Sequence, residues 1–302
     1  MNKKRKFLSF VLNLMIVMFF LACVTLLLYP FVSNHLMYAR QYERIVSYDN
    51  RSSKMDDEEK QRYLSAARAY NERLLNDKIG YRLSEKQMEE YLSLLNYESD
   101  NTMGYIRIPK IDVNLMIYHT VDEKYLSAGT GHVPGSSLPV GGKGTNSIIM
   151  GHRGLTSATL FTNLDRLEVS DKFFISILGD KLAYEIDDIS VVEPEKLQDI
   201  SIDPDEDICT LVTCTPYGVN SHRLVLRGHR IPYDADDDNQ GAGGESYYRI
   251  RVPDILGAPD LSEILAILGA AVLITGLIVI IVKKIKRKKT DKEGGNKNEK
   301  DS

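Results

Sequence analysis

Three side chains in this sequence have the functional groups that a thiol-based acyl transfer requires. The apolar segment Thr210–Cys214 ends in a thiol, Arg223 follows this cysteine by nine residues, and His152 occurs far upstream. A thiolate is a strong nucleophile, and an imidazole can carry a proton to or from a reacting group. A guanidinium can stabilise the thiolate, or the oxyanion that forms when the thiolate attacks a carbonyl group. The sequence therefore offers a nucleophile, a base and a cation.

The cysteine content favours a reactive thiol over a disulfide. The chain has three cysteines in 302 residues, and one of them, Cys23, lies in an apolar segment of membrane length. Cys209 and Cys214 are five residues apart on one expected strand, so their side chains point to opposite faces, roughly 16 Å apart. A disulfide needs Cα atoms within about 7 Å of each other. We therefore expect Cys209 to be a small buried apolar residue and Cys214 to be the reactive one.

Spacing alone does not select the base or establish the role of the cation. His152 follows the apolar run Ile148–Met150 at a strand end, where it is either a base or a polar residue that caps the strand. Arg223 begins the strand that returns after the loop 215–222, and it is either a clamp beside the thiol or a surface cation. Five other histidines remain as alternative bases: His35, His119, His132, His222 and His229.

Other kinds of site are not supported by the sequence. The segment Gly141–Thr145 is similar to a phosphate loop, but Ser137 stands where the first glycine of that motif is required. In addition, Lys143 is followed by a glycine where the motif requires serine or threonine. No cysteine or histidine spacing of the zinc type occurs, and the Gly-x-Ser-x-Gly pattern of serine hydrolases is absent. We therefore expect no metal and no cofactor.

Two apolar segments predict that the chain crosses a membrane twice. Residues 7–32 and 262–282 are each long enough to span a hydrocarbon layer of about 30 Å. Basic residues precede the first segment and follow the second, so both termini are expected in the cytoplasm and the middle of the chain outside. The first segment is too long for a cleaved signal peptide and lacks a small-x-small cleavage site before Tyr29. The basic tail is expected to contact anionic lipid headgroups.

Helical patterns precede a β-rich region. Within residues 56–75, Leu64, Ala67 and Leu74 recur at near-helical spacing in a polar, helix-favouring sequence. Ser84 and Gln87 have the types and spacing of a capping box, in which each side chain bonds to the other residue's backbone. An amphipathic pattern follows this box, so a second helix is expected there.

After residue 101 the sequence changes to short β-rich runs separated by glycine, proline, asparagine and aspartate. This rhythm is typical of an antiparallel barrel or sandwich, and a doubly wound parallel sheet is not expected because no long helical patterns alternate with the runs. The acidic, glycine-rich stretch after Pro232 is interpreted as a solvated linker. The net charge of −4 is modest and basic residues gather at the membrane flanks, so no nucleic-acid partner is expected. The expected strands are Tyr105–Ile108, Val113–Tyr118, Ser147–Met150, Phe173–Leu178, Leu182–Val192, Ile208–Cys214 and Leu224–Gly228.

Longer blocks of sequence carry a resemblance to a known family. The segment Thr210–Cys214, with a later arginine and an earlier histidine, resembles the sortase signature. Further blocks make the sequence similar to the class C, pilus-assembling sortases, and the resemblance covers about residues 101–230. These blocks are Gly104–Ile111, Gly131–Pro139, Gly151–Gly154 through Leu160–Leu164, and Thr213–Gly218.

The resemblance implies a mainly β fold, namely an eight-stranded sortase-type β-barrel with N-terminal helices, flanked by two transmembrane helices. It implies that the barrel lies on the outer face of a Gram-positive cell membrane. The expected domains are a cytoplasmic basic segment (1–6), a transmembrane helix (7–32), an N-terminal helical and lid region (33–100), the sortase barrel (101–231), the linker (232–261), a second transmembrane helix (262–282) and a cytoplasmic basic tail (283–302).

The resemblance also assigns roles that spacing leaves open. It implies that Cys214 attacks the Thr–Gly bond of an LPxTG-like sorting signal and forms a thioacyl intermediate. His152 is then the general acid and base, and Arg223 is the clamp for substrate and oxyanion. A lysine amine of the next pilin subunit resolves the intermediate and gives an isopeptide bond. Two alternatives remain: a sortase that anchors surface proteins to peptidoglycan, or a catalytically idle, membrane-tethered binding module.

One segment departs from the family pattern. Pilus sortases often carry a lid before the barrel, in which an Asp-Pro-aromatic tripeptide or a similar one plugs the active site. The corresponding segment, Asn76–Tyr81, contains Asp77, but neither proline nor an aromatic residue follows it directly. Either Tyr81 substitutes for the lid aromatic or the site is open, and we expect a weak or absent plug.

Overall fold

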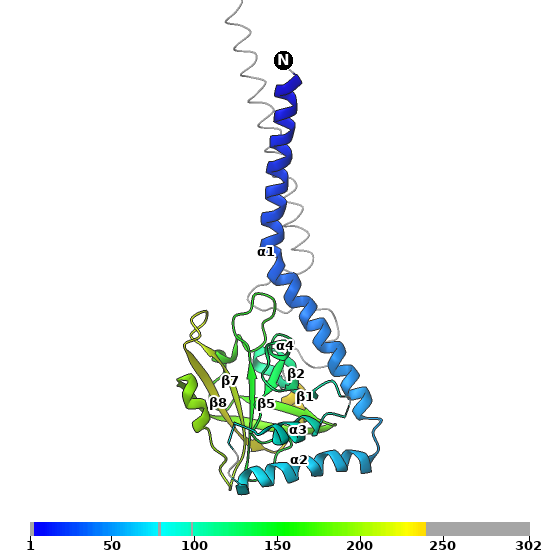
Figure 1. Cartoon of the computed structure of the whole chain (residues 1–302), viewed down its shortest axis with the longest axis vertical. Helices are drawn as coiled ribbons and strands as arrows, with labels where there is room; N and C mark the ends of the chain where they lie inside the picture. Colours follow the sequence, from blue (N-terminus) through cyan, green and yellow to red (C-terminus); the bar gives the residue numbers. More distant parts are fainter. Residues whose placement is uncertain (1–2, 78–79, 98, 240–302) are drawn as a thin grey trace, which may run out of the picture. The chain divides into compact units, whose positions relative to one another are not determined.

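The computed structural model describes residues 3–77, 80–97 and 99–239 of the 302-residue chain (Figure 1). The chain divides into two compact units, one formed by Met1–Phe31 with Arg251–Ser302 and the other by Val32–Ile250. The residues predicted for catalysis, His152, Cys214 and Arg223, all belong to the second unit.

The N-terminal helix α1 (Lys3–Ser52) contains the first predicted membrane segment. Its N-terminal part exposes apolar side chains such as Phe7, Phe19 and Leu26. Within the described ranges, α1 is the one helix that is long and apolar enough to cross a membrane, judged by length and composition. The second predicted segment, 262–282, and the basic tail that follows it lie outside the described residues.

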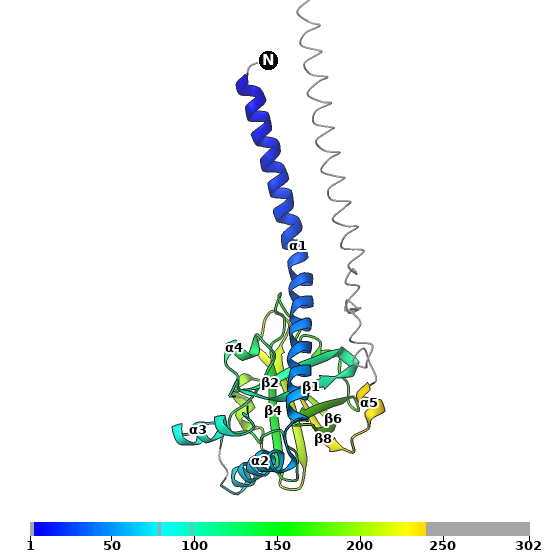
Figure 2. The ribbon, with the colours of Figure 1, turned by 90° about the vertical axis from the view of Figure 1, so that its right-hand side faces the viewer.

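Helices α2 (Asp57–Asp77) and α3 (Glu85–Ser93) lie side by side against the barrel (Figures 1 and 2). The face of α2 that carries Leu64, Ala67 and Leu74 is buried, as its near-helical apolar spacing predicts. The capping box expected at the start of α3 is present, because Gln87 N–H bonds to Ser84 Oγ and the Gln87 side chain bonds back to the Ser84 backbone.

Eight strands close into a barrel in the order β1-β2-β3-β4-β7-β8-β6-β5, which confirms the eight-stranded barrel that the family resemblance implied. Seven of the strands cover the seven β-rich runs predicted from the sequence. Their bounds are β1 Thr102–Ile108, β2 Val113–His119, β3 Thr130–His132, β4 Thr145–Gly151, β5 Lys172–Ile177, β6 Asp180–Val192, β7 Asp207–Thr215 and β8 His222–Ile231.

The barrel differs from the antiparallel sheet expected from the sequence rhythm. Two of its pairings are parallel, β2 with β3 and β4 with β7. Parallel strands need a long connection, so β4 and β7 are distant in the sequence. The alternation of side chains within each strand does not predict that these two strands pair. The extra strand, β3, has three residues and so lacks a readable period of its own.

The barrel wall separates two apolar clusters. The large interior cluster contains Cys209 and Leu211 of β7 together with residues of all the other long strands. A small cluster on the other side of the wall is formed by Ile148, Val212 and Val225. Because successive residues of a strand point to opposite faces, the interior and exterior clusters alternate along β7. The expected opposite orientation of Cys209 and Cys214 follows from the same alternation.

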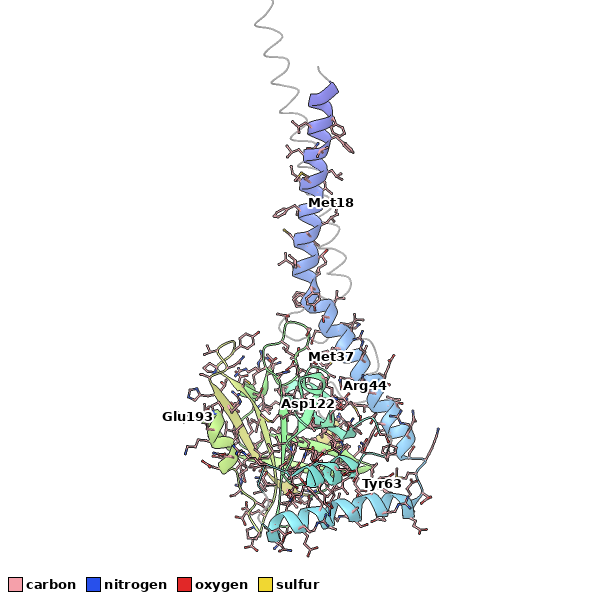
Figure 3. The ribbon with its side chains drawn as sticks, in the orientation of Figure 1. Met18, Met37, Arg44, Tyr63, Asp122 and Glu193 are labelled. Carbon is pink, nitrogen blue, oxygen red and sulfur yellow. The ribbon has the colours of Figure 1, made fainter. Side chains whose placement is uncertain are left out.

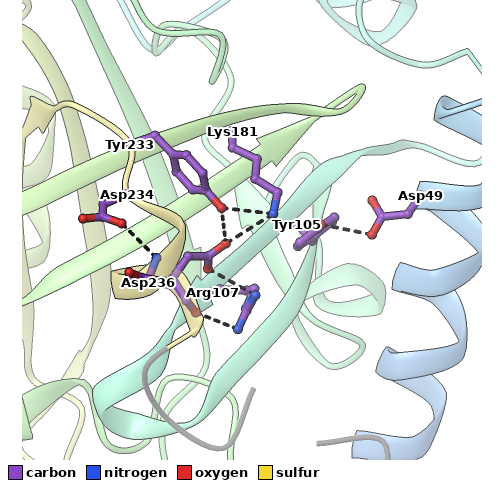
Figure 4. A network of polar contacts seen from close by, with 8 residues as sticks. Asp49, Tyr105, Arg107, Lys181, Tyr233, Asp234 and Asp236 are labelled. Carbon is purple, nitrogen blue, oxygen red and sulfur yellow. Dashed lines mark hydrogen bonds and ion pairs between the residues drawn. The ribbon is translucent and has the colours of Figure 1, made fainter. Parts of the chain in front are cut away.

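The chain after β8 differs from the solvated linker expected there, because it starts with an ordered turn. The short helix α5 (Ala235–Asn239) follows β8 and buries Asp238, which is 2% exposed. Arg107 of β1 binds Asp238 by an ion pair of 3.2 Å to its carboxylate and a hydrogen bond of 2.9 Å to its carbonyl oxygen (Figure 4). Lys181 and Tyr233 also contact this carboxylate, at 3.4 and 2.9 Å. The first residues of the predicted linker are therefore bound to the barrel.

The C-terminal part of α1 is attached to the barrel by tyrosine hydroxyl groups. Tyr48 is fully buried, donates to Met103 O at 2.8 Å and accepts from Leu178 N–H at 2.8 Å. Tyr105 of β1 donates to a carboxylate oxygen of Asp49 at 3.1 Å (Figure 4). Burial raises the pKa of the Asp49 carboxyl, and the Tyr105 hydrogen bond opposes this shift. Each buried polar group of this contact therefore has a partner.

Candidate active site

Strand pairing brings the three predicted catalytic residues into one row. Cys214 of β7 and Arg223 of β8 are direct cross-strand partners. On the other side of β7, the parallel register with β4 runs up to the pair of Met150 with Val212, and His152 follows the last residue of β4. Thr213 Oγ1 donates to Gly151 O at 2.8 Å, which holds the two strand ends together at this point. The ends of three neighbouring strands therefore give the three residues as a row along the backbone, with His152 directly after β4, Cys214 on β7 and Arg223 on β8.

The side chains of Cys214 and Arg223 lie on the outer face of the barrel wall. Residues two apart on a strand point to the same side, so Cys214 shares its face with Val212, and Arg223 shares its face with Val225. Val212 and Val225 both belong to the exterior apolar cluster. The row therefore lies at the end of this cluster and is not inside the barrel.

The two cysteines of β7 have different environments. Cys209 is 0% exposed, and burial raises the pKa of its thiol well above the ordinary range. Cys209 therefore stays a neutral, inaccessible thiol. Cys214 is partly exposed at the end of the same strand. Access to solvent and a cross-strand guanidinium are the conditions in which a cysteine acts as a nucleophile.

The imidazole of His152 is held by a carboxylate that the sequence analysis did not single out. His152 Nε2 lies 3.0 Å from Glu123 Oε2, and Glu123 begins the short helix α4 (Glu123–Leu126). The two residues are 29 positions apart, and no local pattern relates them. With Nε2 in contact with Glu123, Nδ1 is the other ring nitrogen of His152.

The guanidinium of Arg223 is fixed by the loop between β7 and β8. Its Nη1 group donates to the carbonyl oxygens of Asn220 and His222, each at 3.0 Å. A guanidinium has five N–H donors, so about three remain for a substrate carbonyl or oxyanion. Arg223 can therefore act as the clamp that the sequence analysis expected, because two hydrogen bonds hold its guanidinium in place and its other N–H donors remain for a substrate.

A second arginine ties the ends of the catalytic strands together. Arg153 directly follows His152, and its Nη1 donates to Thr215 Oγ1, next to Cys214, at 3.1 Å. Its Nη2 forms an ion pair with Asp165, and its side chain is 7% exposed. From the sequence, Arg153 was known only as the residue after His152, and no role was predicted for it. The structure shows that it cross-links the chain after β4 to the end of β7.

An apolar groove lies beside β4. Its pocket of about 260 Å³ has the 3-10 helix η3 (Pro194–Asp199) on one side and β4 on the other. The start of η3 can be found in Figure 3 by the label of Glu193, the residue directly before this helix. Met150 lines the groove and lies two residues before His152 in the chain. The other apolar lining residues are Val133, Ile148, Pro194, Leu197 and Ile200.

Of the two residues named for the lid, the structure brings one to the groove. Tyr81 lines the pocket and packs against the exterior cluster, and its hydroxyl group donates to Ile200 O. Burial raises the pKa of Tyr81 to about 12, so its hydroxyl group stays neutral. Asp77 is exposed at the last position of α2. The structure thus puts an aromatic ring beside the site, whereas the acidic residue lies at the helix end.

The alternative histidines have other environments. His119 and His132 are fully buried in the barrel, and burial lowers the pKa of both, that of His132 to about 3. His222 precedes Arg223 on β8 and so points to the opposite side of the strand. His229 lies near the other end of β8, 3.4 Å from a carboxylate of Asp187. The fifth alternative, His35, lies on α1.

Comparison with solved structures gives class C sortases. The chain is 42% identical to sortase C1 from Streptococcus agalactiae with a TM-score of 0.62, and the match covers 64% of this chain and 100% of that chain. It is 40% identical to Streptococcus pneumoniae sortase C, with a TM-score of 0.57 over 64% of this chain and 98% of that one. For sortase C from Clostridium perfringens the identity is 34% and the TM-score 0.55, over 63% and 99% of the two chains.

Sequence comparisons agree with this result. The family model described as the sortase domain matches residues 106–231. The chain is 28% identical to sortase A of Bacillus anthracis over 134 residues, which cover 44% of this chain and 62% of that protein. For sortase A of Listeria monocytogenes the identity is 28% over 133 residues, covering 44% and 58%. The chain thus spans about three fifths of the length of these curated relatives. With the barrel topology and the structural matches, these results show that the chain belongs to the sortase family.

Proposed function

We propose that the protein is a membrane-anchored cysteine transpeptidase that cleaves an LPxTG-like sorting signal between threonine and glycine and joins it to a lysine amine of a pilin subunit. The observation that supports this proposal best is the row of His152, Cys214 and Arg223 on three adjacent strand ends. Family membership supports the reaction type, and the class C structural relatives support a pilin as the acceptor.

The proposed reaction has two halves, formation of a thioacyl enzyme and its resolution by an amine. Cys214 gives its proton to His152, and its sulfur attacks the threonine carbonyl carbon while Arg223 stabilises the oxyanion. The imidazolium of His152 protonates the glycine nitrogen, the carbon–nitrogen bond breaks, and a thioacyl enzyme remains. A neutral lysine amine then attacks the same carbon and gives a proton to His152. The carbon–sulfur bond breaks, and the product is an isopeptide.

The groove beside the row fits the apolar part of such a signal. Its lining of aliphatic side chains and Pro194 favours a leucine or proline side chain over a charged one. Because Met150 of this groove lies two residues from His152, a peptide bound in it extends along β4 toward Cys214. Tyr81 occupies part of this groove, so peptide binding requires that its ring move or share the space.

The apolar N-terminal part of α1 is the proposed anchor, with the barrel outside the cell. Basic residues before this segment support a cytoplasmic N-terminus, since positive charge is retained on the cytoplasmic side. In this orientation Cys214 meets secreted proteins that are themselves held in the membrane by their sorting signals.

The experiment that tests the proposal is pilin polymerisation by the full chain in detergent micelles. The full chain, incubated with a pilin that carries a sorting signal and an acceptor lysine, is expected to give ladders that resist heat and SDS. Cys214→Ala should give none, and Cys23→Ala, which removes a thiol of α1, should match the unmodified chain. Ladders from Cys214→Ala, or none from the unmodified chain, would contradict the proposal.

Two alternative functions share parts of this structure. A sortase that anchors proteins to peptidoglycan uses the same three residues and differs in the incoming amine. In a competition between pilin lysine and a peptidoglycan stem peptide, exclusive use of the stem peptide would favour wall anchoring. A catalytically idle binding module would bind a sorting peptide in the groove without cleaving it, which mass spectrometry of the peptide would reveal.

A further inference from the structure

We propose that Glu123 is a positioning residue for the active site, which fixes the tautomer and orientation of the His152 imidazole and stabilises its protonated form. This inference deepens the proposed function and rests on it for its chemical meaning. The observation behind it is the contact of 3.0 Å between His152 Nε2 and Glu123 Oε2. Neither the motif spacing nor the order of the catalytic residues along the chain indicates this contact.

Helix α4 holds Glu123 at the end of β4. The hydroxyl group of Ser127 donates to Glu123 O at 2.7 Å, and the Tyr125 ring stacks on Tyr118 of β2 with centroids 5.3 Å apart. The chain then enters β3, where Thr130 pairs with Gly151, the residue before His152. The position of Glu123 therefore follows from the same sheet that positions the histidine.

The contact decides which ring nitrogen serves the thiol. A carboxylate oxygen only accepts hydrogen bonds, so Nε2 carries the proton of this contact, and neutral His152 has its lone pair on Nδ1. Nδ1 then takes the proton of the Cys214 thiol, which gives a thiolate and an imidazolium. That proton later passes from Nδ1 to the leaving amine. Without Glu123 the other tautomer, with the lone pair on Nε2, becomes accessible and does not serve this transfer.

Charges around His152 make Glu123 the acidic partner of the ring. In the part of the chain that the structure describes, Glu123 is the carboxylate within ion-pair distance of His152. Arg223 belongs to the same row on β8, beyond Cys214, and favours the thiolate. Arg153, the next residue along the chain, is bound to Asp165. A negative charge on one side of the imidazolium and the thiolate on the other both favour the ion pair.

The size of the effect is limited by solvent. The Glu123 side chain is 76% exposed, whereas that of His152 is 23% exposed. Exposed charge pairs are screened by water and salt, and the corresponding effect on the population of the ion pair is about two- to fivefold. A loss of this size distinguishes a positioning residue from a residue that forms bonds with the substrate.

The test measures alkylation of Cys214 by iodoacetamide as a function of pH, in the full chain in detergent, with modification of the Cys214 peptide followed by mass spectrometry. Glu123→Gln keeps the shape of the side chain and removes its charge. Asp122→Asn is the matched control, because it removes the same charge one position earlier (Figure 3). Asp122 contacts Thr120 Oγ1 at 2.8 Å, and asparagine keeps an oxygen for this bond.

Glu123→Gln is expected to reduce the alkylation rate about two- to fivefold between pH 6 and 8. The rates should converge near pH 10, where the thiol ionises without help from the imidazolium. The deficit should also shrink in about 1 M salt, where the Debye length is near 3 Å. Asp122→Asn should follow the unmodified chain throughout.

Two results would overturn the inference. One is a Glu123→Gln profile that superimposes on that of the unmodified chain, and the other is a deficit of equal size at every pH, which indicates general disturbance of the site. Alkylation needs no peptide, so it is independent of the ladder assay. If no ladders form but Glu123→Gln slows alkylation as expected, the proposed function is wrong and the role of Glu123 stands. If ladders form but Glu123→Gln does not slow alkylation, only the role of Glu123 is wrong.

Discussion

Cys214 and Arg223 are direct partners across β7 and β8, and the Arg223 guanidinium is bound to two carbonyl oxygens of the loop that joins these strands. The cation is therefore placed by the hairpin itself. Because a short loop connects the two strands, the backbones of Cys214 and Arg223 become neighbours once this hairpin forms.

Replacing Arg223 tests whether its forked geometry or only its charge matters. Arg223→Lys keeps a positive charge but loses the planar set of donors, and Arg223→Ala loses both. Removal of an oxyanion donor costs about 10²–10³ in kcat, so we expect Arg223→Ala to lose activity in this range and Arg223→Lys to recover little of it. Initial rates of sorting-peptide cleavage measure this, with Arg62→Ala on the exposed face of α2 as control. Full activity of Arg223→Lys would show that only the positive charge of this residue contributes to activity and that its planar donor geometry does not.

Tyr81 is expected to restrict the groove. Tyr81→Ala removes a ring that packs against the exterior cluster, so the KM for a sorting peptide should fall about two- to tenfold as the open groove becomes the dominant state. The same change should lower the free energy of unfolding by about 1–3 kcal/mol, because buried contacts are lost. Peptide kinetics and urea unfolding measure the two effects.

Asp77→Ala is the control for Tyr81, because Asp77 is the other residue named for the lid and is exposed at the end of α2. It should change neither KM nor stability. An increase in KM for Tyr81→Ala would show that the ring helps to bind the peptide and does not obstruct it.

The contact of α5 with the barrel is expected to stabilise the second unit. Asp238→Asn leaves the guanidinium of Arg107 and the ammonium of Lys181 without their common carboxylate (Figure 4). Both cations are partly exposed, so we expect a loss of about 1–3 kcal/mol in the free energy of unfolding, below the range for a fully buried pair. Asp236→Asn, in the exposed first turn of α5, should have no effect in the same urea titration. Equal stability of the two variants would show that α5 is not held by this carboxylate.

His132 is expected to make the barrel sensitive to acid. Its pKa is lowered to about 3 by burial, whereas an unfolded histidine titrates near 6.5. The unfolded state therefore binds an extra proton below pH 6.5, so stability is fully present above this pH and is lost as the pH falls toward 3. The loss from this group approaches about 1.4 kcal/mol per pH unit. Urea unfolding between pH 7 and pH 4 measures the slope.

His132→Gln should be less stable at pH 7, because hydrogen bonds to Tyr91 and Ser137 are lost, but its stability should fall less steeply with acid. His229→Gln, at an exposed position, is the control and should keep the slope of the unmodified chain. An unchanged slope in His132→Gln would assign the acid sensitivity to other groups.

Local patterns were sufficient for the elements themselves. The capping box of Ser84 and Gln87, the apolar face of α2 and seven of the eight strands follow from side-chain types within a few residues of each other. The strand β3 was missed, because three residues carry no period. The resemblance to sortases supplied the number of strands and the choice of His152, which spacing could not give.

The sequence by itself determined that Cys209 and Cys214 face opposite sides of one strand, because alternation along a strand depends only on the backbone. Only the tertiary structure decided that the end of β4, which His152 follows, lies beside the end of β7, which carries Cys214, since this depends on the parallel pairing of these strands across 62 residues. It also decided that Glu123 holds the imidazole and that Asp238 is buried. Such contacts form when strands distant in the chain bury their apolar faces together, and the polar residues at their ends meet as a consequence.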